Sequence, residues 1–137
     1  MEITISQEQG SAPVAVLKLS GQLDGQTYQD LIMKAQQTIG EGAKNILLDM
    51  SDLTYISSAG LVSLHTIALL LKGETPPDPE QGWSALKSME TSSSGGAQKN
   101  IKLLNPRPEV VSVLDMVGFS AVFEVFTDRQ KALESFS

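Results

Sequence analysis

Two adjacent serines and a glycine, Ser57, Ser58 and Gly60, lie between an apolar run and a segment whose leucines recur at helical spacing. A serine at the start of a helix can cap it by accepting a hydrogen bond from a free backbone N–H group, which is the commoner use. It can also carry a phosphate, because the free N–H groups and the positive end of the helix dipole favour an anion there. The residue types alone leave both uses open.

The only histidine of the chain does not pair with these serines to make a nucleophile. Ser58 and His65 are seven positions apart on one expected helix, which is about 10.5 Å of axial rise at 1.5 Å per residue. That separation is too long for a hydrogen bond. We expect His65 to be a partly buried polar residue on the flank of the helix.

Three aspartates, Asp24, Asp49 and Asp52, can in principle gather around a magnesium ion. No acidic spacing in the chain resembles a calcium loop or a metal-binding helix. We instead expect Asp49 and Asp52 in a turn at the end of a strand, where aspartate is favoured for its local hydrogen bonds. Neither GxGxxG nor GxxxxGK[ST] occurs among the glycines. The sequence therefore predicts no enzyme, no metal site and no cofactor.

Bulk properties limit the classes of partner. A chain of 137 residues is the size of one ordinary domain. The formal net charge of -6 and the sequence pI of about 4.6 argue against binding nucleic acid or anionic lipid through a basic face. The chain contains no cysteine, which fits a reducing compartment. No apolar run is as long as a membrane span and no signal-peptide pattern opens the chain, so we expect a cytoplasmic protein without direct membrane insertion.

Hydrophobic periodicity predicts strands that alternate with helices. This order implies an α/β fold with a mostly parallel sheet of four to five strands, about four helices and the first strand as an antiparallel edge. The expected strands cover residues 1–6, 14–19, 45–49, 100–104 and 122–126. The expected helices begin near Tyr28, at Ser58, at Pro106 or Pro108, and after Thr127 or Asp128.

One segment breaks this pattern. Residues 73–98 contain three prolines near their start and a serine- and glycine-rich stretch near their end, neither of which continues a helix. A short helix carrying Trp83, Leu86 and Met89 can form between them. We expect a single domain over residues 1–137 with an irregular insertion at 73–98, either partly disordered or packed as a lid.

The order of elements predicts where the polar residues meet. Asp24 follows the second expected strand, and Ser57 and Ser58 follow the third. In sheets of this kind, ligands and partners gather at the carboxyl ends of the strands. If the two strands are neighbours, Asp24 and the serines lie close together.

Three stretches in the same order resemble the STAS family, the anti-sigma-factor antagonist domains. Asp49–Leu64 resembles the family signature, with Ser58 and Gly60 on matching positions. Ser20–Asp24 looks like the family's Gly-x-Leu-Asp loop, and Val113–Phe123 looks like the segment that joins the third helix to the last strand. The resemblance spans nearly the whole chain except 73–98, and it implies a STAS-like domain.

The resemblance also implies a function. Family members bind a serine-kinase anti-sigma factor and so release the sigma factor. They are inactivated when the kinase phosphorylates the loop serine and are restored by a PP2C-type phosphatase. By position Ser58 is the phosphoacceptor, with Ser57 as the alternative because many members have aspartate there. The partner-binding residues that the resemblance implies are Asp24, Thr27, Ser57, Ser58, Ala59, Gly60 and Leu61.

Two other functions remain open. The first is a non-phosphorylated STAS subunit of a lipid-transport or scaffold complex, in which Ser58 merely caps the helix. The second is a small-ligand-binding domain that uses a cleft at the strand ends, with 73–98 as a lid and a pocket beneath Trp83. The sequence leaves the oligomeric state open.

Overall fold

The structure is a computed structural model, and it describes residues 1–10, 12–71, 100–119 and 122–136. The segment 73–98 lies outside these residues, and so do the short helix and the lid expected there. The strands are β1 (Glu2–Gln9), β2 (Pro13–Leu23), β3 (Ile46–Ile56), β4 (Ile101–Leu104) and β5 (Val125–Phe126). The helices within the described ranges are α1 (Tyr28–Gly40), α2 (Ser58–Leu71), α4 (Pro108–Met116) and α5 (Arg129–Ser135).

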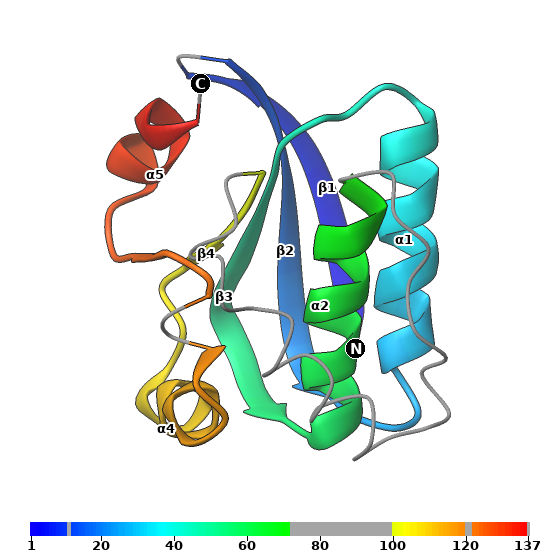
Figure 1. Cartoon of the computed structure of the whole chain (residues 1–137), viewed down its shortest axis with the longest axis vertical. Coiled ribbons are helices and arrows are strands. Elements are labelled where there is room, and N and C mark those ends of the chain that lie inside the picture. The colour runs from blue at the N-terminus through cyan, green and yellow to red at the C-terminus, as the bar shows by residue number, and fades with distance from the viewer. Residues whose placement is uncertain (11, 72–99, 120–121, 137) are drawn as a thin grey trace.

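The five strands form one sheet in the order β1-β2-β3-β4-β5, with helices on both of its faces (Figure 1). β1 pairs antiparallel with β2, and every other neighbouring pair is parallel. The expected α/β class, the mostly parallel sheet and the antiparallel edge strand are therefore confirmed.

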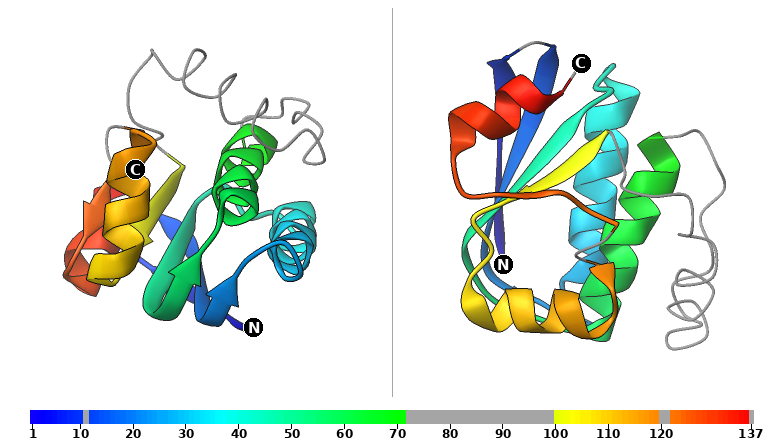
Figure 2. Two further views of the ribbon diagram at one scale, coloured as in Figure 1. Left: turned by 90° about the horizontal axis from the view of Figure 1, so that it is seen from below. Right: turned by 60° about the vertical axis from the view of Figure 1, so that its left-hand side comes forward.

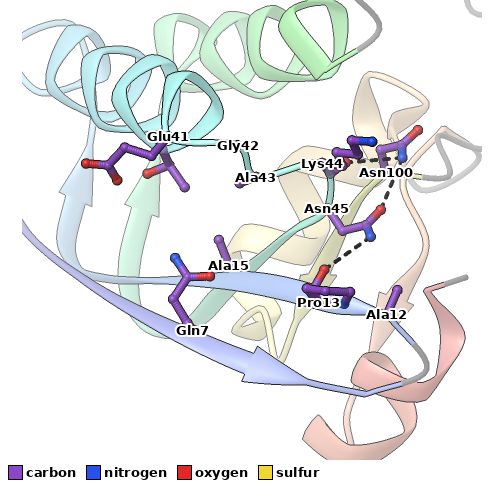
Figure 3. Close-up of a pocket in the computed structure, with 11 residues that line it drawn as sticks. Gln7, Ala12, Pro13, Ala15, Glu41, Gly42, Ala43, Lys44, Asn45 and Asn100 are labelled. Atoms are coloured by element: carbon purple, nitrogen blue, oxygen red, sulfur yellow. Dashed lines mark hydrogen bonds between the residues drawn. The ribbon is translucent and has the colours of Figure 1, made fainter.

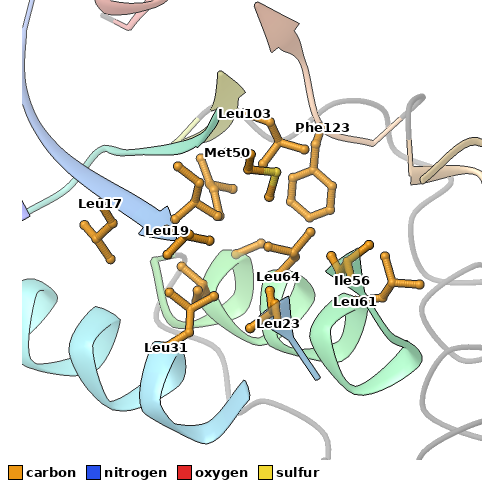
Figure 4. Packing of buried hydrophobic residues seen from close by; sticks show 14 of the residues in the cluster. Leu17, Leu19, Leu23, Leu31, Met50, Ile56, Leu61, Leu64, Leu103 and Phe123 are labelled. Carbon is orange, nitrogen blue, oxygen red and sulfur yellow. The ribbon is translucent and has the colours of Figure 1, made fainter. Parts of the chain in front are cut away.

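The main core lies between the sheet and the two helices α1 and α2, which run side by side on one face (Figure 1). Leu17 and Leu103 from the strands meet Leu31 of α1 and Leu64 of α2 there (Figure 4). All four side chains are fully buried, and burial of each stabilises the fold by about 1.5–3 kcal/mol. This core fixes α2, and with it the serines at its start, against the sheet.

A smaller core lies on the opposite face, where α5 covers the apolar side chains of β2, β3 and β4. A buried lysine holds this helix. Lys102 Nζ donates to the Ser135 carbonyl at 3.1 Å and to the Ser135 hydroxyl at 3.0 Å. The same ammonium group lies 4.9 Å from the centre of the Phe136 ring, within the range of a cation–π contact. Charge and ring contact together anchor the C-terminal helix.

Strands β2 and β3 are longer than the sequence predicts. We expected them to end at residues 19 and 49, but they continue to Leu23 and Ile56. Their polar ends stay paired because the register shifts twice, between Lys18 and Ser20 and between Gly21 and Gln22. These irregularities break the alternation of apolar and polar residues, which is the signal that a sequence pattern depends on.

The expected turn at Asp49 and Asp52 is therefore wrong, since both residues lie inside β3. Asp49 still makes the local hydrogen bonds that were expected of it. Its Oδ1 accepts from the Ser51 hydroxyl at 2.7 Å and from the Ser51 amide at 3.0 Å. Asp52 pairs instead with Lys18 on the neighbouring strand, at 3.2 Å.

The last strand is shorter than predicted. We expected residues 122–126, but only Val125 and Phe126 pair with β4. The amides of Val122 and Phe123 donate to the Phe119 carbonyl at 3.0 and 2.9 Å and so form a turn. The apolar character of this turn reflects core packing, because the Phe119 and Phe123 rings meet edge-to-face with centroids 5.3 Å apart.

The start of α2 approaches the sheet very closely at Gly60. A Cβ atom on Gly60 would lie 2.7 Å from the Leu23 carbonyl oxygen and 2.7 Å from Ile56 Cγ1. Real Cβ atoms do not come so near to backbone, so only glycine fits here without moving the helix. The glycine lets the first turn of α2 rest on the ends of β2 and β3.

We therefore expect Gly60→Ala to destabilise the fold, by about 1–3 kcal/mol, because an overpacked contact with backbone cannot be relieved by a side-chain rotation. Gly40→Ala is the matched control. Gly40 ends α1 with nothing within 4 Å of the added methyl group, and alanine there changes stability by less than about 1 kcal/mol, in the stabilising direction. Urea unfolding measures both. Equal stability of the two variants would contradict the close approach.

Candidate functional site

Ser57 is the residue that caps α2. Its carbonyl accepts from the Leu61 amide at 3.0 Å, which is the first hydrogen bond of the helix. Its hydroxyl oxygen accepts from the Gly60 amide at a longer 3.4 Å. A side-chain oxygen that accepts from the third helical N–H is the usual geometry of an N-cap serine. The hydroxyl of Ser57 is thus engaged by the helix that it starts.

Ser58 is the first residue of α2, and its side chain is exposed. Within the described ranges, its hydroxyl has no hydrogen-bond partner. The first turn of the helix carries no acidic residue, so the positive end of the helix dipole is not already neutralised there. Ser58 therefore presents an accessible hydroxyl at a place where an anion is electrostatically favoured.

The loop after β2 is organised by Asp24 and Thr27. Asp24 Oδ1 accepts from the Gln26 amide at 2.9 Å and from the Thr27 amide at 3.2 Å. In return the Asp24 amide donates to Thr27 Oγ1 at 2.9 Å. Both side chains are half-buried. Sequence reasoning proposed them as partner-binding residues and missed this second role, although an aspartate before a helix is a known signal for such a turn.

The two loops are joined through Leu23. The Ser57 amide donates to the Leu23 carbonyl at 2.9 Å, and the same carbonyl is the atom that Gly60 approaches. β2 and β3 are neighbouring parallel strands, as the expected convergence requires. The structure thus brings the Asp24 loop and the start of α2 together at the carboxyl ends of these strands.

Burial divides the residues that the resemblance assigns to a partner surface. Ser58 is exposed, and Asp24, Thr27, Ser57 and Ala59 are half-buried. Gly60 and Leu61 are buried, and Leu61 belongs to the main core. Ser58 is therefore the most exposed member of the set.

An exposed aromatic residue also lies at this end, and sequence reasoning overlooked it. Tyr55 precedes Ser58 by three residues and is 50% exposed. It pairs in register with Gln22 at the end of β2. The predicted strand stopped at residue 49, which left Tyr55 in an unassigned loop. An exposed tyrosine next to two polar loops is the type of residue that anchors protein–protein contacts.

The remaining candidates for chemistry lie away from this site or inside the core. His65 is only 7% exposed on α2, which is deeper than the flank position we expected. No group of three or more histidine, cysteine or acidic side chains suited to a metal ion occurs in the described part of the chain. None of the helices described is long and apolar enough to cross a membrane.

A cavity of about 570 Å³ lies at the opposite ends of the parallel strands (Figure 3). Asn45 and Asn100, which immediately precede β3 and β4, line it and are hydrogen-bonded to each other at 3.1 Å. None of the residues around Ser58 contributes to its wall. This cavity is therefore not at the carboxyl ends of the strands, where a ligand-binding cleft was expected, and the expected pocket beneath Trp83 lies outside the described residues.

Solved structures show the same fold at low sequence identity. An anti-sigma factor antagonist from Mycobacterium paratuberculosis superposes with a TM-score of 0.63 at 16% identity, over 96% of this chain and 92% of that one. The unphosphorylated form of the anti-sigma factor antagonist SpoIIAA gives a TM-score of 0.57 at 19% identity, over 96% and 94% of the two chains. The phosphorylated form of SpoIIAA from Bacillus gives 0.57 at 18%, over 96% and 97%.

Comparison of sequences gives two further results. No curated protein matches the chain. The family model of the STAS domain matches residues 5–73, just over half of the chain. That range contains the Asp24 loop, Tyr55 and both serines, so the match covers the whole of the site described above. The chain belongs to the STAS domain family.

Proposed function

We propose that the protein is an anti-sigma-factor antagonist. In this role it binds a serine-kinase anti-sigma factor through the surface around Ser58. It acts by binding and does not catalyse a reaction. Phosphorylation of Ser58 by the kinase switches binding off, and a PP2C-type phosphatase restores it. The observation that carries the proposal is that the two serines at the start of α2 differ. Ser57 caps the helix, and the exposed Ser58 hydroxyl lies at the positive end of the helix dipole.

The choice of Ser58 over Ser57 rests on hydrogen bonding and access. A phosphate on Ser57 would displace the contact between its oxygen and the Gly60 amide, and it would have to fit a half-buried position. A phosphate on Ser58 breaks no hydrogen bond within the described residues. A kinase active site also reaches an exposed hydroxyl without unfolding the helix start.

The charge of the phosphate provides the switch. Phosphoserine adds about -1.5 to -2 charges at pH 7. The helix dipole compensates part of that charge within the protein, so the fold tolerates it. The neighbouring loop carries the Asp24 carboxylate, and the chain already has a formal net charge of -6. A partner surface complementary to a neutral hydroxyl beside Asp24 and Tyr55 would then face a concentrated negative charge, which weakens association.

The comparisons support this proposal in one respect. SpoIIAA is an anti-sigma factor antagonist that has been solved in both unphosphorylated and phosphorylated forms, and both share the fold of this chain. That protein shows that the fold accommodates phosphate. A role beside a sigma factor also implies that the protein works in the cytoplasm.

The runner-up is a STAS subunit of a lipid-transport or scaffold complex that is never phosphorylated. In that function Ser58 was expected merely to cap α2, but the capping oxygen belongs to Ser57. An exposed serine without a structural task fits the phosphorylated switch better. Incubation with the cognate kinase and ATP, followed by mass spectrometry of the tryptic peptide, separates the two functions.

We expect Ser58→Asp to weaken binding to the cognate anti-sigma kinase at least about tenfold, equivalent to about 1.4 kcal/mol. Ser58→Ala should bind like the wild type but accept no phosphate. Titration calorimetry measures both affinities. Ser57→Ala is the control at the neighbouring hydroxyl, and it should still be phosphorylated. Phosphate found on Ser57, or equal affinity of the Asp and Ala variants at position 58, would contradict the proposed switch.

The same variants should differ in stability as well, and here the larger loss should come from position 57 and not from position 58. Ser57→Ala removes the helix cap and should lower the free energy of unfolding by about 0.5–2 kcal/mol. Ser58→Ala should change it by less than about 0.5 kcal/mol, since no hydrogen bond is lost. Ser58→Asp should raise it by about 0.3–1 kcal/mol at low ionic strength, because the carboxylate interacts with the helix dipole. Urea unfolding at low and high salt tests this order, and a larger loss from Ser58→Ala than from Ser57→Ala would reverse the two assignments.

A further inference from the structure

β1 is an unusually open edge of the sheet. It is the outermost strand, eight residues long, and within the described ranges it pairs with β2 alone. Its other edge therefore presents unpaired backbone N–H and C=O groups. Proteins usually protect such an edge with charged side chains, especially lysine, or with proline, a bulge or a very short strand. β1 carries Glu2 and Glu8 near its ends but no proline or lysine, and it pairs with β2 residue by residue without a register shift.

A partly apolar groove follows this edge. Its apolar lining comes from Met1, which precedes β1, from Ile3 of β1 and from Met33 of α1, around a volume of about 640 Å³. The side chain of Met33 is 64% exposed, and that of Ile5, on the same face of the strand as Ile3, is 38% exposed. Figure 2 shows α1 alongside the part of the sheet that contains the N-terminus. An open strand edge beside an apolar groove is the geometry of strand addition.

We propose that a second copy of this chain occupies the groove, and that two β1 strands pair antiparallel about a twofold axis at Thr4. The pairing would join two five-stranded sheets into one continuous sheet. An antiparallel edge is self-complementary, so a symmetric dimer needs no other partner. Because this axis is perpendicular to the sheet, the α1 helices of both copies lie on the same face of the combined sheet.

Side-chain chemistry selects the register. With Thr4 opposite Thr4 of the second copy, Ile3 lies opposite Ile5 and Glu2 opposite Ser6. Apolar pairs across two strands stabilise the pairing. A shift that puts Ile5 on the axis would instead place Glu2 opposite Glu8 and Ile3 opposite Gln7. Like charges directly opposite each other are destabilising, so the register centred on Thr4 is preferred over the one centred on Ile5.

The polar rim of the groove is also complementary to itself. Asp30 and Lys34 of α1 both line it and are exposed. Neither forms an ion pair with another residue in the described part of the chain. A twofold axis beside α1 brings the aspartate of one copy towards the lysine of the other. This exchange offsets part of the repulsion between two chains that each carry a net charge of -6.

Single cysteines test the register, because the chain has no cysteine of its own. Residues directly opposite in an antiparallel pair have Cα atoms about 4.5–5.5 Å apart, which suits a disulfide. Thr4→Cys should therefore give a covalent dimer on mild oxidation. Glu2→Cys and Ser6→Cys should each stay uncrosslinked alone and crosslink when mixed. Thr4→Cys that crosslinks no faster than Glu2→Cys, read on a non-reducing gel, would overturn the proposal.

Sedimentation equilibrium of the 137-residue chain tests the dimer. The wild type should be dimeric at high micromolar concentration, and Met33→Lys should raise the dimer dissociation constant at least tenfold. Met116→Lys is the matched control, since Met116 is also exposed but lies on α4. Asp30→Lys should weaken the dimer, and adding Lys34→Asp should restore it. A monomeric wild type up to millimolar concentration, or equal effects of the two methionine variants, would refute the dimer.

Discussion

The hydrogen bond from the Ser57 amide to the Leu23 carbonyl is the contact on which the site depends. It ties the end of β3 to the end of β2, beyond the point where the apolar pattern of the strands has stopped. With that tie, the first turn of α2 rests on Leu23 and Ile56, and the absence of a side chain at Gly60 makes the contact possible. The position of Ser58 follows from these backbone contacts and not from any interaction of its own.

The sheet was predictable because its core strands carry a clear apolar signal, and its order followed from the alternation of strands with helices. The ends of β2 and β3 were not predictable, since polar residues such as Ser20 and Asp52 pair there, and Ser51 and Thr54 fall at shifts in the register. Thr54 Oγ1 donates to the Gly21 carbonyl at 3.0 Å, a contact between segments 33 residues apart that no local pattern contains. The length of β5 was overestimated for the opposite reason. Val122 and Phe123 are apolar because they pack in the core, although they do not belong to the strand.

The sequence predicted that the Asp24 loop and the two serines meet at the strand ends, but it did not predict the hydrogen bonds that each residue makes there. A cap and a phosphoacceptor have the same sequence signature, and the choice between Ser57 and Ser58 depends on which carbonyl accepts the first helical hydrogen bond. That boundary is a matter of one residue, which is finer than any periodicity resolves. Tyr55 was missed for a related reason. The predicted strand ended at residue 49, so the sequence did not show that Tyr55 lies near the end of β3. The hydrogen bonds that Asp24 makes within its own loop were also not predicted, because the family resemblance suggested only a partner contact for this residue.

The proposed functions involve two surfaces of the molecule. At the carboxyl ends of β2 and β3, backbone hydrogen bonds hold a polar surface in place, and the Ser58 hydroxyl has no partner within the described ranges. Along the β1 edge, by contrast, backbone groups are left without partners within the described ranges, and the groove beside Met33 is lined by both apolar and charged side chains. A charge added at Ser58 acts on the first surface through electrostatics that falls off over about 8–10 Å at physiological ionic strength. The proposed pairing through β1 depends on backbone hydrogen bonds, apolar contact and the exchange between Asp30 and Lys34. The proposed binding of a kinase depends on the Ser58 hydroxyl, whereas the proposed self-association depends on the backbone edge of β1, so different substitutions test the two proposals.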